Sequence, residues 1–163
     1  MTISHRFFRF LYTLGVTCDP LTRRPLRTAA IPWRRAGIGI EVLLITGRSS
    51  GKWTIPKGWP MLLRSLADAA LEEAYEEAGV RGRVAPVALG VVNAPKSYRL
   101  AGTIDWLLQV HGLEVTEELA HWPEQQQRRR RWMTIDEAAR RVRPKALVSL
   151  ILALPDLVAP DQR

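Results

Sequence analysis

A short segment, residues 56–79, constrains the fold of this chain most strongly, because a break in regular structure leads directly into a capped helix. Residues 56–60 place two prolines and one glycine within five positions, so we predict that they form no regular structure. Ser65 stands three positions before Asp68, which predicts a helix start, and Gly79 is a natural C-terminal cap. The spacing therefore predicts a helix over residues 66–78, preceded by an irregular loop.

This predicted helix carries four glutamates and contains no lysine or arginine. At about 100° per residue, Glu73, Glu76 and Glu77 fall on one face. Glu72 repels Glu76 and Glu73 repels Glu77 at i,i+4 spacing, and the last turn of a helix disfavours anions. A hard divalent cation removes this repulsion, so the three glutamates on the shared face are candidate Mg2+ ligands. The alternative is a solvated acidic face that pairs with arginines elsewhere in the fold.

From Gly58 onward, the spacing resembles the Nudix box, in which a glycine is followed at fixed intervals by a glutamate and by Arg-Glu-aliphatic-x-Glu-Glu-x-Gly-aliphatic. Seven of its nine defined positions match this chain: Gly58, Glu73, Ala74, Glu76, Glu77, Gly79 and Val80. Two positions depart from the box: Arg64 stands where the family has a glutamate, and Glu72 stands where it has an arginine. Because they lie on the order of 12 Å apart along the helix axis, the sequence does not require them to form a direct salt bridge.

The resemblance covers most of residues 29–154. Within the family, the chain is similar to the bacterial branch related to diphosphoinositol polyphosphate and diadenosine polyphosphate hydrolases. Residues 30–34, 53–61, 128–132 and 134–138 carry it beyond the box. It implies an α+β fold, the Nudix α/β/α sandwich around a mixed β-sheet. It also implies attack of water on a phosphoanhydride bond, with Mg2+ as the cofactor and Mn2+ as a substitute.

The resemblance also implies the site residues. Glu73, Glu76 and Glu77 are the predicted metal ligands and catalytic residues. Glu73 or Glu76 is the favoured general base, and the alternatives are glutamates outside the box: Glu114, Glu117, Glu118 and Glu124. The predicted substrate-binding residues are four that offer a cationic side chain to phosphate and the box glycine: Arg34, Arg48, Lys57, Arg143 and Gly58.

The remaining sequence predicts strands with few helices, an order typical of α+β folds rather than of alternating βαβ units. Thr134 and Glu137 form a second capping box, which predicts a helix that Pro144 ends, and residues 145–154 predict a last helix. One turn is predicted at residues 94–97. Apolar and β-branched runs predict strands over residues 29–33, 38–46, 53–55, 83–93 and 98–110.

Length, charge and cysteine content bound the organisation and the partners. The 163 residues suit one domain, with a basic extension over residues 1–28, the Nudix domain over residues 29–154 and a tail over residues 155–163. The formal net charge of +8 favours a small anionic, phosphate-rich substrate. No apolar run approaches the roughly 20 residues that cross a membrane. Cys18 is the only cysteine, which suits a cytoplasmic protein, and the pattern specifies no oligomeric state.

Two alternative functions stay open at this point. The arginines at residues 128–131 favour pyrophosphohydrolase action on the 5′ end of RNA. On a strand, however, only two of the four face one cleft, and no RNA-binding motif accompanies them.

The exchange at Arg64 and Glu72 instead favours a degenerate Nudix module that binds a nucleotide without hydrolysing it. Trp59 is a candidate for stacking on a base.

Overall fold

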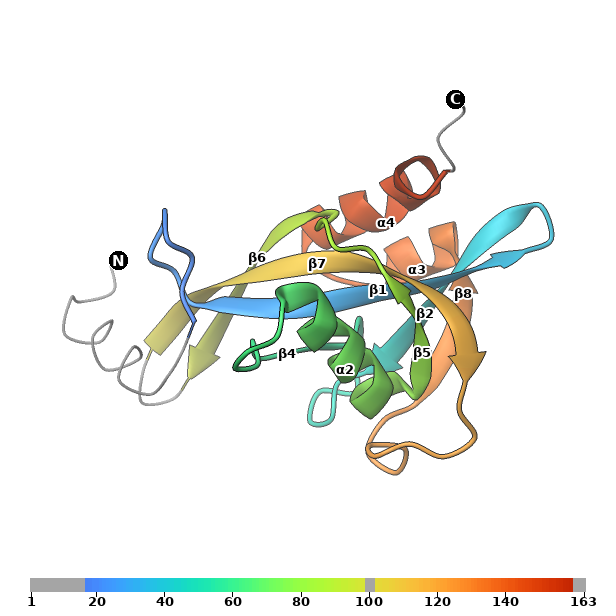
Figure 1. Cartoon of the computed structure of the whole chain (residues 1–163), viewed down its shortest axis with the longest axis horizontal. Helices are drawn as coiled ribbons and strands as arrows, with labels where there is room; N and C mark the ends of the chain where they lie inside the picture. Colours follow the sequence, from blue (N-terminus) through green and yellow to red (C-terminus); the bar gives the residue numbers. More distant parts are fainter. Residues whose placement is uncertain (1–16, 99–101, 160–163) are drawn as a thin grey trace.

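A mixed β-sheet organises the molecule (Figure 1). The computed structural model describes residues 17–98 and 102–159. In chain order, the strands are β1 Leu26–Ala36, β2 Gly39–Thr46, β3 Trp53–Thr54, β4 Lys57–Gly58, β5 Val80–Val84, β6 Gly90–Tyr98, β7 Gly102–Glu118 and β8 Arg130–Thr134. These described strands form one sheet in the order β3-β2-β1-β7-β5, with β4 beside β1, β6 beside β7 and β8 beside β2. Only β1 and β7 pair in parallel among them, which confirms the predicted mixed sheet.

Helices cover both faces of this sheet: α2 (Leu66–Ala78) on one face, and α3 (Ile135–Arg141) and α4 (Lys145–Leu157) on the other (Figure 1). Side chains alternate along each strand and so enter two separate cores. Ala30 of β1 belongs to the core under α2, whereas Ile31 belongs to the core under α3 and α4. This is the predicted α/β/α sandwich. None of the described helices is long and apolar enough to cross a membrane.

Helix α2 has the predicted bounds because local signals define both of its ends. The Ser65 hydroxyl accepts a hydrogen bond from the backbone N–H of Asp68 at 3.0 Å. Gly79 adopts the left-handed conformation, with φ of 64°, and its N–H donates to the carbonyl of Tyr75. Three alanines on the buried side, Ala70, Ala74 and Ala78, let the helix backbone lie close to the sheet.

The prediction that residues 56–60 contain no regular structure is wrong at Lys57 and Gly58. These two residues form β4 and pair antiparallel with Ala29 and Thr28 of β1. The two prolines flank the pair rather than interrupt it, and the carbonyl of Pro56 accepts from the N–H of Ala30 at 3.1 Å. A two-residue strand therefore fixes the loop to the centre of the sheet just before α2.

The turn predicted at residues 94–97 is also wrong, because these residues lie inside β6 and pair with β7. Within the described sheet, β6 pairs with β7 alone, and an edge strand tolerates Pro95 since one side of its backbone needs no partner. The break falls earlier, at residues 85–89, and divides the run predicted over residues 83–93 into β5 and β6.

The ends of the domain also differ from expectation. Strand β1 begins at Leu26, inside the predicted extension, and a bridge between Cys18 and Pro25 precedes it. The last helix continues past Leu154 to Leu157, with Pro155 in its final turns. Residues 1–16 of the predicted extension and residues 160–163 of the predicted tail lie outside the described residues.

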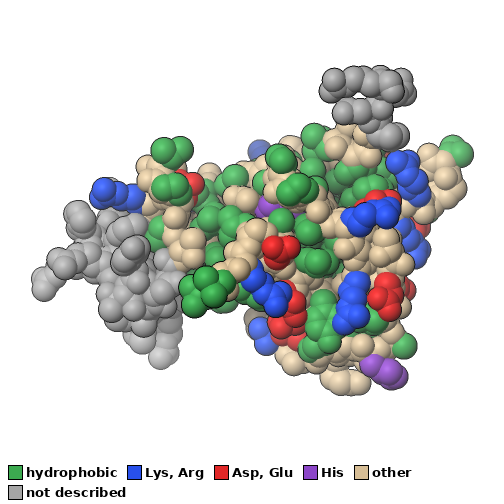
Figure 2. Space-filling model, in the orientation of Figure 1, with side chains coloured by type: hydrophobic (Ala, Val, Ile, Leu, Met, Phe, Trp, Pro, Cys, Tyr) green, Lys and Arg blue, Asp and Glu red, His purple; other side chains and the backbone are tan. Residues whose placement is uncertain are grey.

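Basic and acidic side chains lie interspersed on the face of the molecule shown in Figure 2. Across the described residues, several basic and acidic side chains form exposed or half-exposed ion pairs between neighbouring elements, and each pair contributes about 0–1 kcal/mol. They include the pairs Arg34–Glu41, Arg64–Glu72 and Arg83–Glu114, with N–O distances of 2.8, 3.0 and 3.0 Å. Part of the positive charge of the described residues is therefore paired with acids locally.

Candidate active site

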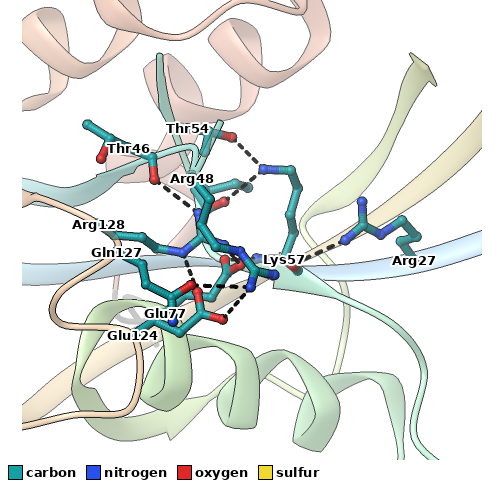
Figure 3. A network of polar contacts seen from close by, with 10 residues as sticks. Arg27, Thr46, Arg48, Thr54, Lys57, Glu77, Glu124, Gln127 and Arg128 are labelled. Carbon is teal, nitrogen blue, oxygen red and sulfur yellow. Dashed lines mark hydrogen bonds and ion pairs between the residues drawn. The ribbon is translucent and has the colours of Figure 1, made fainter. Parts of the chain in front are cut away.

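The buried carboxylate of Glu77 lies at the centre of the candidate site (Figure 3). One of its oxygens, Oε2, accepts the backbone N–H of Lys57 at 3.0 Å. The other, Oε1, pairs with the guanidinium of Arg128. Burial raises the pKa of Glu77, and the Lys57 N–H and the charge of Arg128 oppose that rise. Strand β4 and the segment before β8 thus both fix the same side chain of α2.

Arg128 joins three parts of the chain that are distant in sequence (Figure 3). Its Nε donates to Glu124 at 2.5 Å, its Nη1 donates to the carbonyl of Thr46 at 3.0 Å, and its Nη2 pairs with Glu77. Only 6% of its side chain is exposed. Glu124 also lies 3.4 Å from Arg48, which is exposed on the turn after β2. The site is therefore a polar network of alternating charges.

Glu73 lies beside Glu77 on the same face of α2 and is half-buried. Burial, together with the charges of Glu77 and Glu76, raises its pKa to about 7, while Arg27 opposes the shift. Gly58 of β4 packs against this carboxylate so closely that an added Cβ would lie 1.6 Å from Oε1. The structure thus places Glu73 and Glu77 side by side, with the charge of Glu76 acting on Glu73, and it places the box glycine against Glu73.

The donors in this cluster suit a hard divalent cation. Carboxylate oxygens are the ligands that Mg2+ prefers, and mutual repulsion among Glu73, Glu76 and Glu77 is what a cation relieves. In residues 17–98 and 102–159, however, no group of three acidic, histidine or cysteine side chains is already arranged around an ion position. Both oxygens of Glu77 are engaged by Arg128 and Lys57. The candidate ligands are gathered, and binding an ion requires them to rearrange.

A small pocket lined by basic side chains shares Lys57 with the network around Glu77. Its volume is about 220 Å3, and its lining includes the predicted residues Lys57 and Arg143 together with Lys52 and Trp53. The ammonium of Lys57 donates to the hydroxyl of Thr54 at 2.9 Å, while its backbone N–H reaches Glu77. Lys57 therefore connects the pocket to the acidic cluster. Sequence reasoning missed Lys52, whose one local signal is its position directly before the first residue of β3.

The other two predicted substrate arginines lie elsewhere. Arg34 on β1 donates twice to Glu41, at 2.9 and 2.8 Å, and its guanidinium lies 4.2 Å from the ring centre of Trp132. It does not line the basic pocket. Arg48 reaches the acidic network through Glu124 rather than the pocket. Of the four predicted cationic side chains, the pocket therefore brings together Lys57 and Arg143.

The exchanged charges of the box do meet. Arg64 Nη1 donates to Glu72 Oε2 at 3.0 Å, across eight positions of sequence. The loop before α2 folds back to allow this, with Leu63 at a positive φ of 61° and the N–H of Arg64 donating to the carbonyl of Met61. The axial distance estimated for a straight helix does not apply, because Arg64 precedes the helix. A salt bridge of reversed polarity thus joins the two departing positions.

Two arginines of the run before and within β8, Arg128 and Arg130, are largely buried and bonded within the fold, whereas Arg129 and Arg131 are exposed. Arg130 donates to the carbonyls of Ala78 and Gly79 at 2.7 and 3.0 Å, so it supplies the cation that the last turn of α2 lacks. Arg129 lies over the ring of Trp53, 5.9 Å from its centre, and Arg131 pairs with Glu137 at 3.3 Å.

Known proteins resemble this chain in sequence. A family model for the NUDIX domain matches residues 23–151. The chain is 37% identical over 105 residues to "Nudix hydrolase 16, mitochondrial" of Arabidopsis thaliana, with 63% of this chain and 58% of that protein covered. It is 33% identical over 103 residues to diphosphoinositol polyphosphate phosphohydrolase 3-beta of Homo sapiens, with coverages of 60% and 57%. The chain thus spans little more than half the length of these relatives.

Solved structures share the fold. An Ap4A hydrolase from C. elegans, in a binary complex, superposes with a TM-score of 0.62 at 17% identity, covering 82% of this chain and 97% of that chain. A NUDIX hydrolase from Nitrosomonas europaea gives a TM-score of 0.62 at 18% identity, with coverages of 82% and 89%. Since the family model matches most of the chain and the sheet and helices agree with these structures, the chain belongs to the Nudix hydrolase family.

Proposed function

We propose that this chain is a Mg2+-dependent pyrophosphohydrolase that cleaves a phosphoanhydride bond in a small, phosphate-rich substrate. The substrate classes are dinucleoside polyphosphates, nucleoside diphosphate derivatives and inositol pyrophosphates. One observation carries the proposal: Lys57 joins the buried carboxylate of Glu77 to a pocket lined by basic side chains. The relatives support it, since one is named a diphosphoinositol polyphosphate phosphohydrolase and another an Ap4A hydrolase.

Each part of the site has a role in this proposal. Glu73, Glu76 and Glu77 hold the metal, which when bound lowers the pKa of a water and screens the phosphate charge. Mn2+ substitutes for Mg2+. Lys57, Arg143 and Lys52 neutralise the phosphates of the substrate and orient the scissile bond. Glu73 or Glu76 accepts the proton of the attacking water, and Glu124 is the alternative base from outside the box, since it contacts Arg128 within the same network.

The pocket limits what it can hold. At about 220 Å3, it is smaller than the roughly 300–1,000 Å3 of pockets that enclose a whole ligand. We therefore assign it one or two phosphate groups of the substrate, and the remainder of the substrate extends beyond it. Trp59, which is 47% exposed and follows Gly58, is the candidate to stack on a base.

The test is a phosphate-release screen over diadenosine polyphosphates, ADP-ribose, nucleoside triphosphates and inositol pyrophosphates, each with and without Mg2+. We expect turnover that EDTA abolishes and a melting temperature that Mg2+ raises by mass action. Glu73→Gln and Glu77→Gln should each lower turnover by orders of magnitude, while Glu72→Gln, on the same helix, retains most of it. EDTA-resistant release, or near-native rates in both former variants, would contradict the proposal.

The second candidate function is a Nudix module that binds a nucleotide without turnover. The reversed salt bridge between Arg64 and Glu72 favours it, because both family positions that it occupies have changed. Saturable nucleotide binding without release of phosphate in the screen would select this candidate. The cytoplasmic location stays a prediction, to be checked by fractionation.

A further inference from the structure

The contacts of Glu77 affect metal binding, because this predicted metal ligand is already paired with a cationic side chain. Arg128 pairs with Oε1 of Glu77, and 6% of the arginine side chain and 8% of the glutamate side chain are exposed. A buried pair of this kind is costly to break by removing one partner, since the remaining charge is then left without compensation. Any ion that coordinates Glu77 therefore has to replace Arg128 or share the carboxylate with it.

The two oxygens of Glu77 are not equally available to an ion. Oε2 accepts the N–H of Lys57 at 3.0 Å, and its withdrawal would leave that backbone donor of β4 without this acceptor. Oε1 is different, because the Glu77 carboxylate can turn Oε1 away from Nη2 while Arg128 keeps its two further contacts. Its Nε stays on Glu124 at 2.5 Å, and its Nη1 stays on the carbonyl of Thr46 at 3.0 Å. Release of Oε1 is thus the smaller change.

We infer that Arg128 is an internal counter-cation of the metal site, which holds Glu77 before the metal binds and is displaced from Oε1 when it does. This inference rests on the metal site of the proposed function. When Mg2+ binds, Oε1 exchanges one cationic partner for another, while Arg128 stays paired with Glu124. Arg128 is a positioning residue, because it keeps Glu77 ordered beside Glu73 in the metal-free protein.

The exchange has a measurable consequence for affinity. Only molecules in which Oε1 is released can bind the ion, so the apparent Kd exceeds the intrinsic Kd by the inverse of that fraction. Removing the guanidinium should therefore tighten Mg2+ binding, although it makes the metal-free protein less stable. Removing a residue that merely supports the ligands of a metal site has the opposite effect, because its loss lowers the affinity for the metal.

The experiment compares Mg2+ affinity in wild type, Arg128→Gln and Arg129→Gln by isothermal titration calorimetry and by melting temperature at increasing Mg2+. Arg129→Gln is the matched control, since it removes the same charge one position away, where the side chain lies over Trp53. We expect Arg128→Gln to bind Mg2+ about tenfold more tightly than wild type, the scale of a close buried charge pair. Arg129→Gln should change the affinity far less, and the gain in melting temperature on adding Mg2+ should be largest for Arg128→Gln.

Equal or weaker Mg2+ binding by Arg128→Gln would overturn the inference while leaving the proposed function intact. Equal tightening in both variants would overturn it too, because a general charge effect would then explain the change. Failure of the wild type to bind Mg2+ would remove the proposed metal site and the inference together. If Arg128→Gln does not fold, guanidinium NMR of the wild type decides. Mg2+ should shift the Nη signals of Arg128 more than its Nε–H signal, and unchanged Nη signals would overturn the inference.

Discussion

Gly58 and Glu73 constrain each other at the scale of single residues. A Cβ at position 58 would lie 1.6 Å from Oε1 of Glu73 and 1.8 Å from its Cδ. Because the carboxylate ends a flexible side chain, it can swing away and leave the backbone in place. A substitution here should therefore disturb the ligand position much more than the fold.

We predict that Gly58→Ala lowers turnover on the substrate found in the screen by about 100-fold, the cost of displacing a reacting group by about 1 Å. The free energy of unfolding should change by less than about 1 kcal/mol, as measured by urea denaturation. Gly39→Ala is the control, because its Cβ would meet only the carbonyl of Ala36, at 3.9 Å. Equal turnover in the two variants would mean that the contact of Gly58 with Glu73 does not position the carboxylate.

What the sequence could predict at this scale depends on distance along the chain. The shared face of Glu73, Glu76 and Glu77 follows from helical spacing, so the local pattern sufficed. The contact between Glu77 and Arg128 joins positions 51 residues apart, and only the pairing of β8 with β2 brings them together. Lys57 and Arg143 likewise meet through the packing of the sheet against α4. Their charge was readable from the sequence, and their proximity was not.

Helix α2 and the loop before it form one unit at the scale of elements. The salt bridge between Arg64 and Glu72 ties the loop to the second turn of the helix, with a 3.0 Å contact between half-exposed side chains. Local rules predicted the helix correctly, since Ser65 and Gly79 cap its ends within the segment itself. The same rules failed at β4 and β6, where pairing with β1 and β7 overrides the local signal of proline.

We predict that Arg64 and Glu72 couple by about 0.5 kcal/mol in a double-mutant cycle of unfolding free energies, as expected for an exposed ion pair. The cycle consists of the wild type, Arg64→Ala, Glu72→Ala and the double variant. Arg64→Ala should also weaken Mg2+ binding or turnover. Arg64→Glu combined with Glu72→Arg restores the family polarity and should recover or exceed the native turnover. A coupling indistinguishable from zero would mean that the contact has no energetic role and that the two substitutions are independent.

The architecture of the whole molecule could be predicted because the box resembles that of the Nudix family, and this resemblance implied the sandwich. The surface could not be predicted in the same way. A formal net charge of +8 suggests a polyanion-binding face, yet the arginines nearest the site are engaged within the fold. Arg128 pairs with Glu77 and Glu124, and Arg130 caps α2 and lies over Trp122. The net charge therefore does not show where on the surface the excess positive charge lies.

The engagement of Arg128 and Arg130 within the fold affects the alternative of RNA 5′-end processing. Salt dependence measures how many phosphates a protein contacts, because each contact releases counterions from the nucleic acid. We predict weak, sequence-independent binding of a single-stranded 5′-triphosphate RNA, with an affinity that falls by about tenfold or more between roughly 50 and 200 mM salt. Fluorescence anisotropy over a salt series measures this, with a second RNA of unrelated sequence as the control. Hydrolysis of the small substrate should depend less on salt, since the basic pocket holds only one or two of its phosphates. Tight RNA binding that resists salt, together with pyrophosphate release from the RNA end, would favour RNA as the substrate.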